Sequence, residues 1–226
     1  MELFKAQSVQ FSSKTQRIIA GVSIGIEKGT VTGFLGRSGS GKSTLLKLIG
    51  GILVPTSGKV FFDGIDIQLM TNAQNKNFRK RCAFVFQDSA LWENQNIEQN
   101  LSLPLQTQTV EISAFEQRER IAQVCHRVGY TRPLSLRPVD LSMGEQKRVA
   151  FARALISDPE VLFLDECTES LDVGGVELMM KILKDFIADG KTILYVSHRE
   201  SFIREMGGTI YEVERGFVRG ADDYEI

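Results

Sequence analysis

Alternating and continuous apolar positions divide the chain into two kinds of predicted strand. Residues 2–30 indicate antiparallel strands, with strict alternation over Val22–Ile26. The run 161–164 is wholly apolar and the run 192–196 is apolar after Thr192, which is typical of parallel strands buried on both faces. A shorter apolar run covers 83–86. The pattern therefore predicts an α/β fold in which a mostly parallel sheet is joined to an N-terminal antiparallel β-subdomain.

The middle of the chain changes from strand–helix alternation to mostly helical periodicity. Ser113 precedes Glu116 by three residues, and Ser142 stands in the same relation to Glu145, so both pairs predict capped helix starts. We interpret the chain as one domain over 1–226, with an inserted helical subdomain. The approximate limits are 1–87 and 156–226 for the core and 88–155 for the helical subdomain.

Composition and charge limit the kinds of function that the chain can have. The formal net charge of −1 argues against a broad basic surface for nucleic acid. The cysteines Cys82, Cys125 and Cys167 show no metal-binding spacing, so we expect a reduced compartment. We expect no signal peptide, and no apolar run is long enough to cross a bilayer. Any membrane role is therefore expected to require a partner.

A glycine-rich stretch has the pattern G-x-x-x-x-G-K-[ST] between an apolar run and a periodic helix. Glycines allow successive backbone N–H groups to converge on one anion, and the helix start adds further N–H groups. A glycine-rich turn without a ligand is the alternative, and the strand–loop–helix context favours a phosphate site. Lys42 can reach the β- and γ-phosphates, Ser43 can hold Mg²⁺, and Thr44 can touch the α-phosphate. The predicted phosphate-binding residues are Gly36, Arg37, Ser38, Gly39, Ser40, Gly41, Lys42, Ser43 and Thr44.

Four polar residues follow predicted strands: Gln87, Asp165, Glu166 and His198. Each alone is weak support, because a polar residue after a strand is often a surface or turn residue. Ligands of parallel sheets bind at the edge where the strands end, so the shared placement favours a site. Asp165 can orient Mg²⁺ through its water shell, and Glu166 can act as general base. His198 can bond the γ-phosphate or the attacking water, and Gln87 can sense both metal and phosphate.

The segment Leu141–Ala150 predicts a second anion site at a helix start. A plain capped helix is the alternative interpretation. Because the glycine-rich loop already forms one complete phosphate cradle, we expect this second site to serve the nucleotide of a partner.

These motifs together resemble those of ATP-binding cassette (ABC) ATPases over nearly the whole chain. The resemblance implies ATP and Mg²⁺ as cofactors, and catalytic roles for Lys42, Gln87, Glu166 and His198. It also implies that two copies pair head to tail, with Ser142 and Gly144 of one copy facing the γ-phosphate held by the other. The matching motifs, in family order, are Walker A (36–44), the Q-loop (Gln87), the LSGGQ signature (141–145), Walker B (161–166), the D-loop (170–172) and the switch histidine (His198).

Several positions differ from the family pattern. Ser13 stands where an aromatic residue normally stacks on adenine, and Phe11 on the same strand face is a substitute candidate. Met143 replaces a signature glycine, which is tolerable if that position is helical. Glu145 replaces glutamine and places a negative charge near the nucleotide, which the helix dipole partly offsets. The remaining departures follow Walker B: Cys167 and Glu169. None removes a phosphate, metal or water ligand, so we expect an active ATPase.

The segment Asp88–Leu105 resembles the region after the Q-loop in one group of these ATPases. That group includes bacterial MCE-associated phospholipid-trafficking, lipoprotein-releasing and division-associated ATPases. The resemblance implies the ATPase subunit of a bacterial membrane complex that moves a lipid or other hydrophobic substrate. The expected partners are a second copy, membrane-spanning permease subunits and lipid-binding periplasmic components, at the cytoplasmic face of the cell membrane. Trp92 is either a permease contact or a core tryptophan of the helical subdomain.

Two other functions remain open at this stage. The same ATPase cycle can signal mechanically to periplasmic partners without transport. A soluble ABC ATPase acting on DNA or ribosomes is disfavoured by the near-neutral charge and by the absence of a coiled-coil insertion. A P-loop kinase or GTPase does not explain the signature helix and His198.

Overall fold

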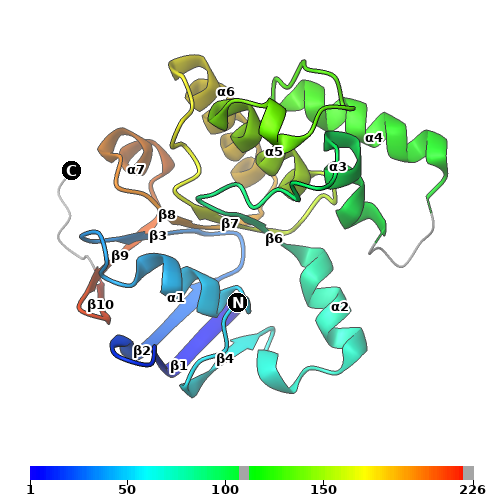
Figure 1. Cartoon of the computed structure of the whole chain (residues 1–226). Helices are drawn as coiled ribbons and strands as arrows, with labels where there is room; N and C mark the ends of the chain where they lie inside the picture. Colours follow the sequence, from blue (N-terminus) through cyan, green and yellow to red (C-terminus); the bar gives the residue numbers. More distant parts are fainter. Residues whose placement is uncertain (107–111, 221–226) are drawn as a thin grey trace.

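The computed structural model describes residues 1–106 and 112–220, which contain two β-sheets (Figure 1). The smaller sheet is antiparallel and has the strand order β2-β1-β4-β5. This confirms the predicted antiparallel strands at the start of the chain. Its strands are β1 (Glu2–Ser12), β2 (Arg17–Glu27), β4 (Ser57–Phe62) and β5 (Ile65–Asp66).

The larger sheet has the order β10-β9-β3-β8-β7-β6, and every neighbouring pair is parallel except β10 with β9. All residues of β3, β7 and β8 are buried, as the sequence predicted for β7 and β8. The predicted α/β fold class is confirmed. The strands are β3 (Val31–Leu35), β6 (Cys82–Val85), β7 (Val161–Asp165), β8 (Thr192–Val196), β9 (Thr209–Glu214) and β10 (Phe217–Gly220).

The helices fall into two groups along the chain. Between β6 and β7, the helices α3, α4 and α5 and the short η2 gather on one side of the molecule in Figure 1. Their bounds are α3 (Ile97–Gln106), α4 (Ala114–Arg127), η2 (Pro138–Asp140) and α5 (Met143–Leu155). The other helices are α1 (Lys42–Ile49), η1 (Ile67–Leu69), α2 (Asn72–Arg81), α6 (Val173–Ala188) and α7 (Glu200–Met206). Within the described residues, no helix combines the length and apolar character that crossing a membrane requires.

Successive residues of a central strand serve two different apolar clusters. Val161 and Phe163 of β7 pack with β1, β2 and α1, whereas Leu162 and Leu164 pack with α3, α5 and α6. Side chains alternate across a strand, so a strand between two layers must be apolar at every position. The ring of Phe163 also stacks on that of Phe84 in β6, with centroids 5.4 Å apart. This packing holds the carboxyl ends of the strands, and therefore the site, in fixed relative positions.

Two local features add to the expectations from sequence. The helix α2 was not predicted, because it is highly charged and Phe78 is its one buried residue. Its start is a capping box formed by Thr71 and Gln74. The side chain of Trp92 is 55% exposed, so of its two interpretations the core tryptophan is wrong.

Candidate nucleotide site

The loop between β3 and α1 has the backbone geometry of an anion-binding turn. Gly36, Gly39 and Gly41 have φ values of 141°, 77° and 105°, in the left-handed region that glycine tolerates best. A Cβ atom on Gly36 would collide with the carbonyl oxygen of Val213. The helix α1 begins directly after the loop, so its first N–H groups are available to the same anion. The loop can therefore bind phosphate oxygens with its main chain.

Lys42 lies within this loop. Its Nζ donates hydrogen bonds to the carbonyl oxygens of Gly36, at 2.8 Å, and Arg37, at 2.9 Å. Burial lowers the pKa of Lys42, while the nearby carboxylates of Glu166 and Asp165 act in the opposite direction. The ammonium group is thus positioned to exchange carbonyl contacts for phosphate oxygens at the same place.

Ser43 and Asp165 form the part of the site that suits a metal ion. Ser43 Oγ donates a 2.7 Å hydrogen bond to Asp165 Oδ1. The other carboxylate oxygen, Oδ2, is buried without a hydrogen-bond partner and lies 3.6 Å from Lys47 Nζ. Ser40 Oγ is also buried and unbonded, so two of the four such atoms in the described part of the chain lie here. Buried polar atoms are normally bonded, and oxygen donors suit Mg²⁺, so these residues fit a phosphate–magnesium ligand.

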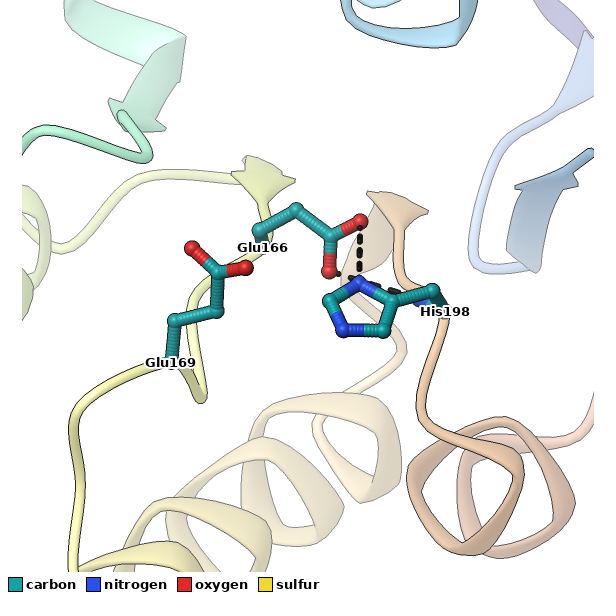
Figure 2. A group of neighbouring side chains, drawn as sticks. All are labelled: Glu166, Glu169 and His198. Atoms are coloured by element: carbon teal, nitrogen blue, oxygen red, sulfur yellow. Dashed lines mark hydrogen bonds and ion pairs between the residues drawn. The ribbon is translucent and has the colours of Figure 1, made fainter. Parts of the chain in front are cut away.

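Glu166 and His198 come together from the ends of β7 and β8 (Figure 2). Glu166 Oε1 lies 3.0 Å from His198 Nδ1, and the His198 main-chain N–H donates to Glu166 Oε2 at 3.3 Å. Glu166 is largely buried and has a φ of 47°, whereas the His198 side chain is exposed. A left-handed conformation in a non-glycine residue costs free energy and often occurs at functional sites. The structure therefore joins the predicted base to the predicted switch histidine.

Gln87, predicted to sense the metal and the phosphate, is hydrogen-bonded to Glu169, a contact that the sequence did not predict. Its Nε2 donates a 3.1 Å hydrogen bond to Glu169 Oε2. Figure 2 shows Glu169 beside Glu166 and His198, and one ligand atom from each of these three residues lies within 4.8 Å of the others. Glu166 and His198 are already bonded to each other, and Glu169 is bonded to Gln87. We therefore assign no metal to this group.

The start of α5 confirms the predicted capping box. Ser142 Oγ accepts from the Glu145 N–H at 3.3 Å, and Glu145 Oε2 accepts from the Ser142 N–H at 2.8 Å. The Ser142 main chain lowers the pKa of Glu145, with further contributions from the Ser142 hydroxyl and Arg132.

Met143 is the first residue of the helix, so no glycine is required there. Gly144 lies close to the D-loop, because an added Cβ would lie 2.9 Å from the carbonyl oxygen of Ser170.

The two residues predicted to contact adenine do not share a strand. The strand β1 ends at Ser12, and Ser13 lies in the following turn, where its N–H donates to the Gln16 carbonyl oxygen at 2.8 Å. The expected common strand face is therefore wrong for Ser13. Phe11 is half-buried and packs against the cluster beneath the antiparallel sheet. The hairpin constrains Ser13 through its hydroxyl as well, which accepts from the Gln16 N–H at 3.1 Å.

Sequence reasoning missed several cations that hold the loops of the site. Lys147 Nζ donates to the carbonyl oxygens of Phe86 and Gln87, and Arg199 donates to that of Thr168. Lys147 is 2% exposed. Lys147 lies four residues before the buried Phe151, on the inner face of a helix. That spacing is the one feature of the sequence that could have predicted its burial.

The fold and the site together define an ABC ATPase. A sequence model of the family described as ABC transporter matches residues 19–169, and the chain belongs to this family. The chain is 33% identical over 196 residues to the methionine import ATP-binding protein MetN of Rhizobium meliloti, covering 86% of this chain and 54% of that protein. With MetN of Mannheimia succiniciproducens it shares 35% identity over 207 residues, covering 91% and 59%. The chain thus spans a little over half the length of these relatives.

Solved structures agree with this assignment. The chain superposes on the ATP-binding cassette MJ0796, a dimer bound to ADP and Pi, with a TM-score of 0.90 and 31% identity, covering 96% of this chain and 97% of that one. It also matches cbiO1 of Clostridium perfringens, part of the transporter complex cbiONQ, with a TM-score of 0.77 and 29% identity over 96% and 87% of the two chains. Family membership confirms an ATPase that uses ATP and Mg²⁺. The finer resemblance to lipid, lipoprotein and division ATPases stays a prediction, since the relatives above are named for methionine import.

Proposed function

We propose that this chain hydrolyses ATP as one of two copies that pair head to tail and drive a membrane transporter. The observation that carries the proposal is the meeting of three groups at the carboxyl edge of one sheet. They are the Lys42 loop, the Ser43–Asp165 pair and the Glu166–His198 pair. In phosphoryl transfer, positioning and charge stabilisation supply most of the catalysis, and each of these groups supplies one part.

Phosphate binding belongs to the loop and to the start of α1. The left-handed glycines turn the main-chain N–H groups inward, and Lys42 adds a positive charge next to them. Ser40 Oγ, buried and unbonded, supplies a further polar contact. Arg37 and Ser38 are exposed at the mouth of the loop, and Thr44 follows Ser43 in the first turn of α1.

The residues that would hold the metal ion are Ser43, Asp165 and Gln87. Mg²⁺, when bound, neutralises charge on the phosphate oxygens. Ser43 Oγ would offer it a lone pair, and the Asp165 carboxylate would accept hydrogen bonds from its water ligands. The hydrogen bond between these side chains holds both oxygens in place before binding.

Glu166 acts as the general base. It takes a proton from the attacking water while the water oxygen bonds to the γ-phosphorus and the bond to the ADP oxygen breaks. The ring and the main chain of His198 hold its carboxylate from one side. Burial of Glu166 excludes bulk water, so the carboxylate meets a water that the site has positioned.

The second copy supplies the start of α5. Ser142 and Gly144 would face the γ-phosphate held by the partner, and the helix N-terminus favours an anion there. The dimeric cassette of similar fold supports this pairing. Glu145 directs its carboxylate into its own helix cap, which limits its repulsion of the nucleotide.

The transported substrate has two candidates. The region Asp88–Leu105 supports a lipid or other hydrophobic substrate, and the exposed Trp92 within it is our proposed permease contact. The names of the MetN relatives support methionine import instead. A Glu166→Gln variant purified with ATP from detergent-solubilised membranes tests both. A permease with lipid-binding components supports the first, an importer that binds methionine supports the second, and a hydrolase-linked partner that moves no substrate contradicts transport.

A further inference from the structure

Glu169 is a carboxylate that the proposed reaction does not use. It lies three residues after Glu166, and its main-chain N–H donates to the Glu166 carbonyl oxygen at 3.2 Å, whereas its carboxylate accepts a hydrogen bond from Gln87. Figure 2 shows the Glu169 carboxylate on the side of Glu166 opposite to His198, with no contact drawn from it to either. A carboxylate in this position can act through the Gln87 side-chain amide, to which it is hydrogen-bonded.

The chemistry of that hydrogen bond fixes the orientation of the amide. An ionised carboxylate only accepts hydrogen bonds, whereas a glutamine amide has a donating NH₂ end and an accepting oxygen. Glu169 Oε2 must therefore face Nε2 of Gln87, as the 3.1 Å contact shows. This leaves Gln87 Oε1, the atom that can ligate a hard cation, free of Glu169.

The main chain of Gln87 is fixed separately, from α5. Lys147 Nζ donates to the Gln87 carbonyl oxygen at 2.6 Å and to that of Phe86 at 3.2 Å. Arg153, six residues further along α5, donates to the carbonyl oxygens of Ser89 and Ala90 at 3.0 and 2.8 Å. Two cations of one helix thus hold four carbonyls of residues 86–90.

The held segment is strained, which explains why it needs these bonds. Ser89 and Ala90 have φ values of 62° and 44°, a conformation that costs free energy in non-glycine residues. Lys147 is nearly fully buried, so its charge requires the carbonyl partners that it has. The main chain of Gln87 is therefore set by α5, and its side chain is set by the loop after β7.

We propose that Glu169 is a positioning residue that directs Gln87 Oε1 to the metal ion, acting on a main chain that Lys147 holds in place. This inference rests on the proposed function, in which Gln87 is a metal ligand. Residues that orient a metal ligand typically change metal affinity by about 10- to 100-fold when they are removed.

The test measures metal binding without turnover. Mn²⁺ replaces Mg²⁺, the nucleotide is the β,γ-imido analogue of ATP, and the electron paramagnetic resonance signal of free Mn²⁺ reports binding. We expect Glu169→Ala to weaken Mn²⁺ binding about tenfold. Glu169→Gln should weaken it in the same direction, because its amide donates as well as accepts and no longer fixes the Gln87 amide. Glu119→Gln, the same charge change at an exposed position of α4, is the matched control and should change nothing.

A double variant separates the possible failures. If Glu169 acts through Gln87, Glu169→Ala has no further effect in a Gln87→Ala background. A persisting effect would show that Glu169 binds the metal itself or acts on Glu166, and would overturn the inference. Normal binding in Glu169→Ala with weakened binding in Gln87→Ala would also overturn it, while leaving the proposed function intact. Normal binding in Gln87→Ala would contradict the metal role of Gln87 and the inference with it. Thermal unfolding of each variant confirms that it is folded.

Discussion

The hydroxyl of Ser43 and the carboxylate of Asp165 are joined by a 2.7 Å hydrogen bond across 122 positions of the chain. Ser43 belongs to the first turn of α1, and Asp165 ends β7. The strand before α1 and β7 are separated in the sheet by β8. The metal part of the site therefore exists only in the folded sheet, and no local segment can form it alone.

This bond leads to a prediction about metal binding. Asp165→Asn keeps the size of the side chain and an acceptor for Ser43, but removes the negative charge that attracts a cation. We expect the Mg²⁺ concentration for half-maximal ATP hydrolysis to rise by about tenfold or more. Asp66→Asn is the control, because Asp66 is another buried aspartate that caps η1 outside the site. An unchanged Mg²⁺ dependence in Asp165→Asn would remove Asp165 from the metal site.

The glycines of the phosphate loop differ in how far they tolerate a side chain. Gly39 has a φ of 77° and open space around its would-be Cβ, so Gly39→Ala should cost about 1–2 kcal/mol of unfolding free energy. Gly36→Ala adds a collision with the Val213 carbonyl oxygen to a similar strain, and should cost more. Chemical denaturation of the two variants measures the difference. Equal costs would show that the loop can shift away from β9.

One buried thiol predicts a pH dependence of stability. Burial raises the pKa of Cys125 from 9.0 to about 11, so the folded state disfavours the thiolate. Its contribution to stability is complete below pH 9 and is lost as the pH rises towards 11. The difference in denaturation midpoint between the natural chain and Cys125→Ala should therefore shrink over this interval. A constant difference would show that the Cys125 thiolate is as well tolerated in the folded chain as in the unfolded chain.

Two serines cap helices in the same way, but only one belongs to the signature. Ser142 and Ser113 each accept a hydrogen bond from the N–H three residues later, so replacement by alanine should cost about 1 kcal/mol of stability at either position. In a Glu166→Gln background, Ser142→Ala should abolish ATP-driven dimerisation and Ser113→Ala should preserve it. Sedimentation velocity with and without ATP measures this. Dimerisation by the Ser142→Ala protein would contradict the head-to-tail pairing.

Much of the fold was predictable because its strands carry simple patterns. Apart from Thr192 at the start of β8 and Asp165 at the end of β7, the residues of these two strands are apolar, since both faces of each strand are covered, and this is visible without any partner strand. The helix α2 shows the opposite case. Most of its residues face solvent and Phe78 is its one buried residue, so its sequence shows no apolar periodicity. The Thr71–Gln74 capping box alone is too short a pattern to predict a helix.

The candidate site could be predicted from the sequence where particular residue types at a fixed spacing are enough to indicate the chemistry. The loop glycines, Lys42 and the pair Asp165–Glu166 fall into this class. The contact between Gln87 and Glu169 does not, because it joins two loops 82 positions apart and depends on side-chain orientation. Lys147 was missed for a related reason. A lysine in a helical pattern is usually solvated, and its burial depends on carbonyl oxygens from another segment.

The central claim is that Glu166 is the base of an ATPase, and phosphate release by the purified chain tests it most directly. The natural chain should release phosphate from ATP with Mg²⁺. Glu166→Gln, which keeps the shape of the side chain, should release it about 100- to 10,000-fold more slowly, the range typical of a lost general base. Binding of ATP, measured by calorimetry on the same preparations, should be retained in the variant. Equal phosphate release by the two proteins would contradict the account.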